Sequence, residues 1–250
     1  MEKPKRVKKE YHLQPYQTEG VTEIGNDEAG AGTFFGSLFV AGVILPQDIE
    51  ERMKNLPKLV IRDSKKMSQK KREEAEKFIK ENALTWNIVE IPCTDVDEMN
   101  ILQARLYGFH EVIRKSNIKP QKILIDGDKF KPYMDDDSGE EIPHECVIEG
   151  DNTYLSIAAA SILAKTAQMR HIEELVKENE EFKKYDIQNN HGYGTQRHLY
   201  GIEQFGVTPY HRLSFGVCRK YSNGRFEEKE KKQKNENTKK YLFTTTEDSD

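Results

Sequence analysis

The first part of the chain alternates short apolar runs with turn residues, a pattern typical of strands. Residues 23–28 and 34–45 are rich in β-forming residues and are separated by the glycine-rich residues 29–32. Two strands joined by a turn are predicted there. Further along, Leu84, Trp86 and Ile88 alternate with polar residues, which predicts another strand.

Three longer stretches have the apolar spacing of amphipathic helices. A charged helix is predicted to begin at Ser68. A single helix is predicted over residues 95–115, opened by a capping box of Asp95 and Glu98. The third, residues 152 to about 177, carries alanines and serines on one face, and small residues let a helix approach a sheet closely.

Two more short strands are predicted at residues 122–126 and 143–149, with an acidic hairpin tip at residues 135–141 between them. Strands therefore come first and then alternate with helices. This order predicts an α/β fold with a mixed central sheet flanked by helices.

The two ends of the chain differ from the middle in composition. Residues 1–20 form a basic arm, and residues 221–250 are dense in Lys, Glu, Asn and Thr with few apolar residues. Such segments bury too little apolar surface to offset the entropy of ordering. We therefore expect one folded domain over residues 21–220 between a flexible arm and a disordered tail.

Composition excludes several classes of protein. The chain has 250 residues, 36% of them hydrophobic and 33% charged, with a net charge of -4, so a strongly basic nucleic-acid-binding domain is excluded. Its three scattered cysteines argue against a disulfide framework or a structural zinc site and favour the cytoplasm. The apolar runs are shorter than a membrane span needs, so no membrane partner is expected. The basic arm leaves a nuclear location open.

Four acidic residues interrupt or end apolar segments. Asp27 and Glu28 end the first predicted strand, Asp126 ends the strand over residues 122–126, and Asp151 precedes the alanine-rich helix. Taken singly, each could be a turn residue or a helix N-cap. Together they suggest carboxylates that converge and need a cation, because buried like charges otherwise repel one another. Oxygen ligands of this kind suit Mg²⁺ or Mn²⁺.

Seven segments, in order along residues 23–216, resemble the motifs of the ribonuclease HII family. The first is similar to the family's G-x-D-E-x-G-R-G signature, and the last resembles P-x-H-R-x-S-F. The seven segments are residues 24–32, 63–66, 100–104, 125–127, 149–151 with 156–165, 192–195 with His198, and 209–215.

The resemblance implies a ribonuclease H-like fold, a mixed central sheet flanked by helices with a C-terminal helical part, as the catalytic domain over residues 21–220. It also implies a metal-dependent endonuclease. Its substrates would be the RNA strand of RNA/DNA hybrids and ribonucleotides embedded in duplex DNA, and its products would carry 5′-phosphate and 3′-hydroxyl ends. It implies that Asp27, Glu28, Asp126 and Asp151 are the catalytic metal ligands. Two ions about 3.5–4 Å apart can activate water and stabilise the leaving oxygen in one in-line displacement. A monomer is expected.

The resemblance also implies residues that bind nucleic acid. Tyr193, between two glycines, could stack on a sugar or base and sense the 2′-hydroxyl that distinguishes RNA from DNA. The glycine-rich turn and several cations are candidate backbone contacts. These candidates are Gly30, Ala31, Gly32, Lys65, Lys66, Lys165, Arg170 and Arg212.

Two features depart from the family pattern. Ala31 stands where the family has an Arg or Lys, which predicts weaker selection for an RNA–DNA junction, and the stretch from Asp126 to Asp151 is unusually long. Residues 32–36 lean toward ribonuclease HIII. The alternatives are therefore a ribonuclease HIII-like or resolvase-like nuclease of the same fold, or a non-catalytic nucleic-acid-binding module. The four acids argue against the last.

Overall fold

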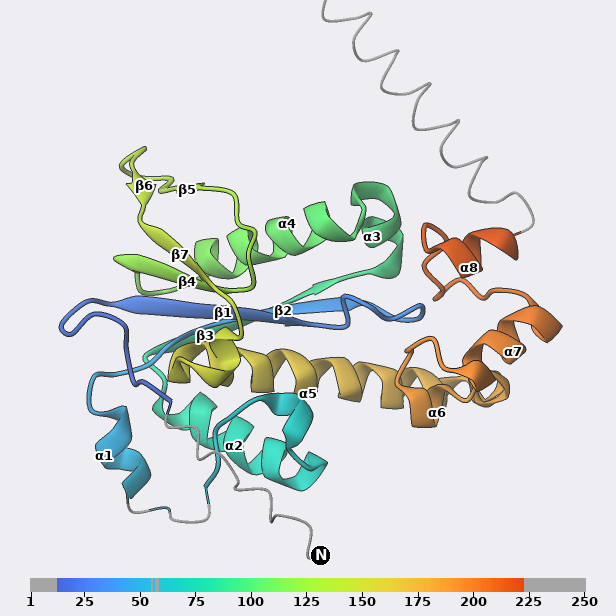
Figure 1. Cartoon of the computed structure of the whole chain (residues 1–250), viewed down its shortest axis with the longest axis horizontal. Helices are drawn as coiled ribbons and strands as arrows, with labels where there is room; N and C mark the ends of the chain where they lie inside the picture. Colours follow the sequence, from blue (N-terminus) through green and yellow to red (C-terminus); the bar gives the residue numbers. More distant parts are fainter. Residues whose placement is uncertain (1–12, 55, 57–58, 223–250) are drawn as a thin grey trace, which may run out of the picture.

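A five-stranded mixed sheet forms the centre of the molecule (Figure 1). The computed structural model describes residues 13–54, 56 and 59–222. Along the sheet the strands are β3 (Thr85–Ile91), β2 (Leu38–Ile44), β1 (Glu23–Ala29), β4 (Lys122–Asp126) and β7 (His144–Val147). β2 is antiparallel to β1 and to β3, whereas β4 is parallel to β1 and to β7. The predicted α/β fold with a mixed sheet is confirmed.

Helices cover both faces of this sheet. In Figure 1, α4 lies on one side and α5 with α2 on the other. Each face has its own buried core, because the strands are apolar on both sides. The α-helices are α1 (Ile49–Lys54), α2 (Gln69–Asn82), α3 (Cys93–Met99), α4 (Ile101–Arg114), α5 (Leu155–Glu178), α6 (Ile187–Asn190), α7 (Gln196–Phe205) and α8 (Gly216–Lys220). The 3₁₀ turns are η1 (Ser64–Lys66), η2 (Gly150–Asn152) and η3 (Glu180–Tyr185).

The last helices form the expected C-terminal helical part. α6, α7 and α8 gather beyond one end of the sheet, next to the C-terminal end of α5 (Figure 1). They share a third apolar cluster with α5, which includes Phe35, Ile172, Phe182, Tyr185 and Ile202. Within the described residues, no helix is both long and apolar enough to cross a lipid bilayer.

The single helix predicted over residues 95–115 is interrupted, so that prediction is wrong. Residues 93–114 form two helices, α3 and α4, separated at Asn100, whose φ of 63° lies in the left-handed region. The Asn100 side chain accepts hydrogen bonds from the backbone N–H groups of Leu102 and Gln103 at 3.0 and 3.2 Å, so it caps α4. Asparagine is suited to both the left-handed conformation and the cap. The expected capping box at Asp95 is therefore replaced by a cap five residues later.

Two boundaries also differ from the expectation. Residues 13–20 are not wholly a flexible arm, because Leu13 is buried and Gln14 exchanges backbone hydrogen bonds with Thr153 and Leu155. Residues 34–37 leave the sheet, and Thr33 and Phe35 instead form isolated bridges to Tyr193 and His211. The expected hairpin is present as β5 (Tyr133–Met134) paired with β6 (Glu141–Ile142). The remaining predicted arm, residues 1–12, and residues 223–250 of the predicted tail lie outside the described residues.

Helix α5 lies close to β1, as its small residues suggested. The closest approach is at Gly25, where an added Cβ would meet the backbone carbonyl carbon of Ser156 and lie 2.5 Å from the nitrogen of Ile157. No side chain larger than hydrogen fits there unless α5 moves. Gly25 lies two residues before Asp27, so this contact also sets where the end of β1 lies relative to the start of α5.

We expect Gly25→Ala to lower the free energy of unfolding by roughly 1–3 kcal/mol, because the added methyl group overpacks a rigid backbone contact. Guanidinium denaturation measures the change. Gly216→Ala is the matched control, since a Cβ there meets no described atom within 4 Å. Equal stability of the two variants would contradict the close packing of α5 on β1.

Candidate active site

The four predicted carboxylates meet at one edge of the sheet. Asp27 and Glu28 lie near the end of β1, and Asp126 is the last residue of β4. The parallel register that pairs Asn26 with Ile125 puts Asp27 beside Asp126. Asp151 lies in η2, between β7 and α5, rather than at the N-cap of α5, which is Tyr154. The helix-cap interpretation of Asp151 is therefore wrong.

Burial and mutual repulsion act on these carboxylates together. Burial, reinforced by the nearby charges of Glu28 and Asp126, raises the pKa of Asp27 well above its usual value. Burial also raises the pKa values of Glu28 and Asp126. It raises the pKa of Asp151 to about 6, with Asp63 and Asp126 adding to the effect. Ionising all four carboxylates together is therefore unfavourable unless positive charge compensates them.

Local donors hold two of these acids in place. The backbone N–H of Gly150 donates to Oδ1 of Asp126 at 2.8 Å, which joins the end of β4 to η2. Ser161 of α5 donates to Asp27, which lowers the pKa of Asp27 against the larger effect of burial. The Ser161 hydroxyl is also 2.9 Å from the hydroxyl of Ser64. Helix α5 and the loop before α2 thus both support the carboxylate of Asp27.

Glu28 has a cationic partner that the sequence analysis missed. Arg105 of α4 reaches it with Nε 2.9 Å from Oε1 and Nη2 3.0 Å from Oε2. Both groups are largely shielded from solvent, and a two-point arginine–carboxylate contact of this kind is geometrically specific. Arg105 directly follows the family-like residues 100–104, so the sequence could have suggested it as a candidate. Only the fold shows that α4 brings it to Glu28 of β1.

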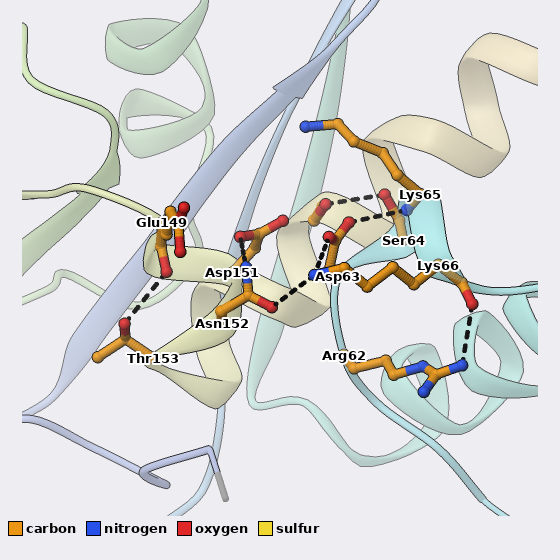
Figure 2. A network of polar contacts seen from close by, with 10 residues as sticks. Arg62, Asp63, Ser64, Lys65, Lys66, Glu149, Asp151, Asn152 and Thr153 are labelled. Atoms are coloured by element: carbon orange, nitrogen blue, oxygen red, sulfur yellow. Dashed lines mark hydrogen bonds and ion pairs between the residues drawn. The ribbon is translucent and has the colours of Figure 1, made fainter. Parts of the chain in front are cut away.

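The loop at residues 62–66 closes the other side of the site (Figure 2). Asp63 accepts the backbone N–H of Lys65 at 2.9 Å and pairs with Nζ of Lys66 at 2.9 Å. Lys66 also donates to Asn152 at 3.3 Å, and Asn152 donates to Oδ1 of Asp151 at 3.1 Å. This network runs from the loop before α2 to a predicted catalytic acid. Asp63 and Asn152 are further supporting residues that spacing alone did not identify.

The positive charge of Lys65 interacts with several of the carboxylates. Burial alone would favour its neutral amine, but the charges of Asp27, Asp151 and other acids nearby raise the pKa of Lys65. In Figure 2 its side chain extends past Asp63, away from the loop. Lys65 is therefore placed to offset negative charge at the site or to meet a phosphate there.

The donor chemistry of the site fits a divalent cation. Four carboxylates supply hard oxygen ligands, and bound cations would relieve the repulsion that raises their pKa values. In the described part of the chain no three acidic, histidine or cysteine side chains already surround one common position. Glu28 points to Arg105 and Asp126 to Gly150. Binding therefore requires side-chain rotations, while the strand ends already bring the residues together.

Tyr193 lies on the turn before α7, with its ring 39% exposed. The Nζ atom of Lys165 lies 5.3 Å from the centre of that ring. Burial, with the charges of Arg72 and Lys65, lowers the pKa of Lys165 to about 8. Thr33 bridges to Tyr193, so the turn at Gly30–Gly32 and the tyrosine are neighbours. These predicted nucleic-acid contacts therefore lie together.

Two of the predicted phosphate contacts have other partners. Arg212 is 0% exposed, and its guanidinium donates to the carbonyl oxygens of Gly30, Ala31 and Gly36 at 2.6, 3.2 and 3.1 Å. Arg212 therefore holds the glycine-rich turn through its carbonyl oxygens and is not available to a phosphate. The prediction that Arg212 contacts the substrate backbone is wrong. Arg170 of α5 is paired with Glu76 of α2, with Nη1 2.8 Å from Oε1.

Comparison with known proteins identifies a family. The family model described as Ribonuclease HII matches residues 24–218. Proteins named Ribonuclease HII from Bacteroides thetaiotaomicron and Phocaeicola vulgatus are each 40% identical over 205 residues, covering 82% of this chain and 94% of theirs. The counterpart from Porphyromonas gingivalis is 37% identical over 203 residues, covering 81% of this chain and 93% of its own.

Solved structures share the fold. The ribonuclease H2 of Pyrococcus horikoshii has a TM-score of 0.63 at 24% identity, covering 82% of this chain and 99% of its own. The Archaeoglobus fulgidus RNase HII, solved as a complex with PCNA, has a TM-score of 0.61 at 24% identity, covering 78% and 95%. Bst-RNase HIII in complex with Mn²⁺ has a TM-score of 0.61 at 18% identity, covering 83% and 71%.

We expect Asp151→Asn to raise the free energy of unfolding in EDTA at pH 8, by at most about 3 kcal/mol. The folded-state pKa of about 6 lies above the usual value of 3.8. The stability that this carboxyl contributes is therefore complete below about pH 4 and is lost as the pH rises through about 6. Asparagine removes that loss and keeps an oxygen for Asn152. Urea unfolding at pH 5 and pH 8 measures the difference, and a larger gain at pH 5 would contradict this electrostatic account.

Proposed function

Since the chain belongs to the ribonuclease HII family, and is thus a ribonuclease H endonuclease that acts on RNA/DNA hybrids, we propose that Asp27, Glu28, Asp126 and Asp151 are its catalytic carboxylates. The observation that carries this proposal is their convergence from β1, β4 and η2, with pKa values raised by burial. Perturbed carboxylates that cluster where strands end are typical of catalytic sites.

The family depends on divalent metal, and we propose Mg²⁺ or Mn²⁺ as the ion for this chain. The four carboxylates would hold it, and their all-oxygen donor set supports this choice over zinc. Bound divalent ions supply activation of water and stabilisation of the leaving oxygen in phosphodiester hydrolysis. The Mn²⁺ complex of Bst-RNase HIII is consistent with such a site.

The chain's own residues set up the carboxylates for this chemistry. The backbone N–H of Gly150 holds Asp126 at 2.8 Å, and Arg105 holds Glu28 through its two-point contact. The positive charge of Lys65 offsets the acids, which lessens their repulsion toward an approaching phosphate. Hydrolysis on the 5′ side of a ribonucleotide would leave the proposed 3′-hydroxyl and 5′-phosphate ends.

We propose that Tyr193 recognises the ribose. Its partly exposed ring lies on a glycine-flanked turn beside Lys165 and next to the turn at Gly30–Gly32. An aromatic ring can stack on a sugar or base while a neighbouring cation meets a phosphate. This arrangement supports ribonucleotides embedded in DNA as substrates beside continuous hybrids.

Ala31 leaves the glycine-rich turn without the charged side chain that the family pattern has. Backbone N–H groups of this turn remain able to face a phosphate. We propose that Lys65, and Lys66 through its link to Asn152, contact substrate phosphates from the loop before α2 and do not replace the charge missing from the turn. Selection for an RNA–DNA junction would then be weaker than the family pattern implies. We further propose a monomer in the cytoplasm, a location that the free cysteines support.

We expect Asp126→Asn to abolish Mg²⁺- and Mn²⁺-dependent cleavage while the protein stays folded, because its carboxylate lies beside Asp27 and is joined to η2, which carries Asp151. The assay compares a duplex with one ribonucleotide, a continuous hybrid and an all-DNA duplex. Glu145→Gln, on the adjacent strand β7 opposite Leu124, is the control and should cleave normally. Cleavage by Asp126→Asn at the rate of the parent would overturn the assignment.

We expect Tyr193→Ala to lower cleavage at a single embedded ribonucleotide by at least about tenfold, the low end of what one lost aromatic–base stack costs. Binding of all-DNA duplex should change little, because phosphate contacts are retained. Tyr200→Ala is the control, an exposed tyrosine on α7. If Tyr193→Ala cleaves like the parent, the residue is structural.

A further inference from the structure

A pair of buried histidines lies directly beneath the turn that carries Tyr193. His198 is 0% exposed and His211 is 1% exposed. His198 belongs to the first turn of α7, and His211 to the segment between α7 and α8. Their Nε2 atoms are 3.1 Å apart. The proposed catalytic chemistry uses neither of them.

The two ends of this pair determine which nitrogen carries each proton. Nδ1 of His198 lies 2.9 Å from the carbonyl oxygen of Tyr193, and a carbonyl can only accept, so this nitrogen must carry the hydrogen. Nδ1 of His211 lies 2.9 Å from the backbone N–H of Thr208, which can only donate, so this nitrogen must be unprotonated. Neutral His211 then carries its hydrogen on Nε2 and donates to the free Nε2 of His198.

These bonds form one directed chain, from Thr208 through His211 and His198 to the Tyr193 carbonyl. A proton added to His198 would place two N–H groups against each other at the central contact, and a proton added to His211 would place its Nδ1–H against the N–H of Thr208. The surroundings agree with neutral rings, since burial lowers the pKa of His198, and burial with the neighbouring His198 lowers the pKa of His211 to about 3.

The chain of bonds connects the tyrosine turn to the glycine-rich turn. His211 bridges to Phe35, and the next residue, Arg212, donates to the carbonyl oxygens of Gly30 and Ala31. On the other side, the N–H of Phe34 donates to the Gly192 carbonyl at 2.8 Å. The histidine pair therefore closes a loop of contacts that includes both turns.

We propose that His198 and His211 are positioning residues that fix the Tyr193 backbone, and through it the direction of the Tyr193 ring, relative to the turn at Gly30–Gly32. The inference rests on the proposed contact of Tyr193 with the ribose. The part that matters for cleavage is the hydrogen bond from Nδ1 of His198, because it ends on Tyr193 itself.

A pair of substitutions separates this bond from simple packing. The amide of Asn can take the place of Nδ1, whereas the amide of Gln takes the place of Nε2. We expect His198→Gln to lower kcat/KM at a single embedded ribonucleotide by about tenfold, the upper range for one lost hydrogen bond, and His198→Asn to lower it less. His110→Gln is the matched control, since His110 lies on α4, away from the turn, and its Nε2 atom is 2.8 Å from the Lys131 carbonyl oxygen.

The deciding measurement combines His198→Gln with Tyr193→Ala. Once the tyrosine ring is removed, His198→Gln should cause no further loss of cleavage, although it should still lower the melting temperature. Losses that multiply in the double variant would show a merely structural role and overturn the inference. Loss with Tyr193→Ala but none with His198→Gln would overturn the inference alone. Full activity of Tyr193→Ala would overturn the proposed ribose contact and the inference with it.

The unsubstituted protein provides a test that does not depend on how the variants fold. Long-range ¹H–¹⁵N NMR of the imidazole rings reports which nitrogen carries hydrogen. We expect the Nδ1–H form for His198 and the Nε2–H form for His211, both neutral at pH 6. Opposite tautomers, or a charged ring at that pH, would contradict the directed chain.

Discussion

The concentration of negative charge at one edge of the sheet is the constraint on which the rest of the site depends. Asp27 and Asp126 lie on adjacent parallel strands, and Asp151 follows on η2. Desolvation and mutual repulsion oppose ionising all of them, which the raised pKa values express. A cluster of this kind destabilises the fold unless donors and cations surround it.

The surrounding elements supply that compensation from three directions. α4 contributes Arg105, which pairs with Glu28, and the loop before α2 contributes Lys65. α5 contributes Ser161, and the close approach at Gly25 is what brings that helix near enough. The contacts that pack the helices on the sheet therefore also bring compensating charges and donors to the carboxylates.

The proposed recognition of the ribose would depend on a second assembly, beyond the end of the sheet. There Arg212 is buried against backbone carbonyl oxygens, and His198 and His211 are linked in a neutral pair. A buried guanidinium is costly unless its N–H groups find acceptors. Its contacts with Gly30, Ala31 and Gly36 hold the glycine-rich turn against the segment that follows α7. The proposed catalytic acids and the glycine-rich turn thus share β1 as a common support.

The sequence by itself determined the mixed α/β sheet, the four acidic positions and the likeness to ribonuclease HII. Apolar periodicity is local, and an acid that ends an apolar strand is visible in one dimension. The tertiary structure alone decided the break at Asn100, the pairing of Arg105 with Glu28 and the burial of Arg212. Each of these depends on residues distant in sequence or on one residue's backbone conformation, and spacing carries no information about which charged side chain finds a partner.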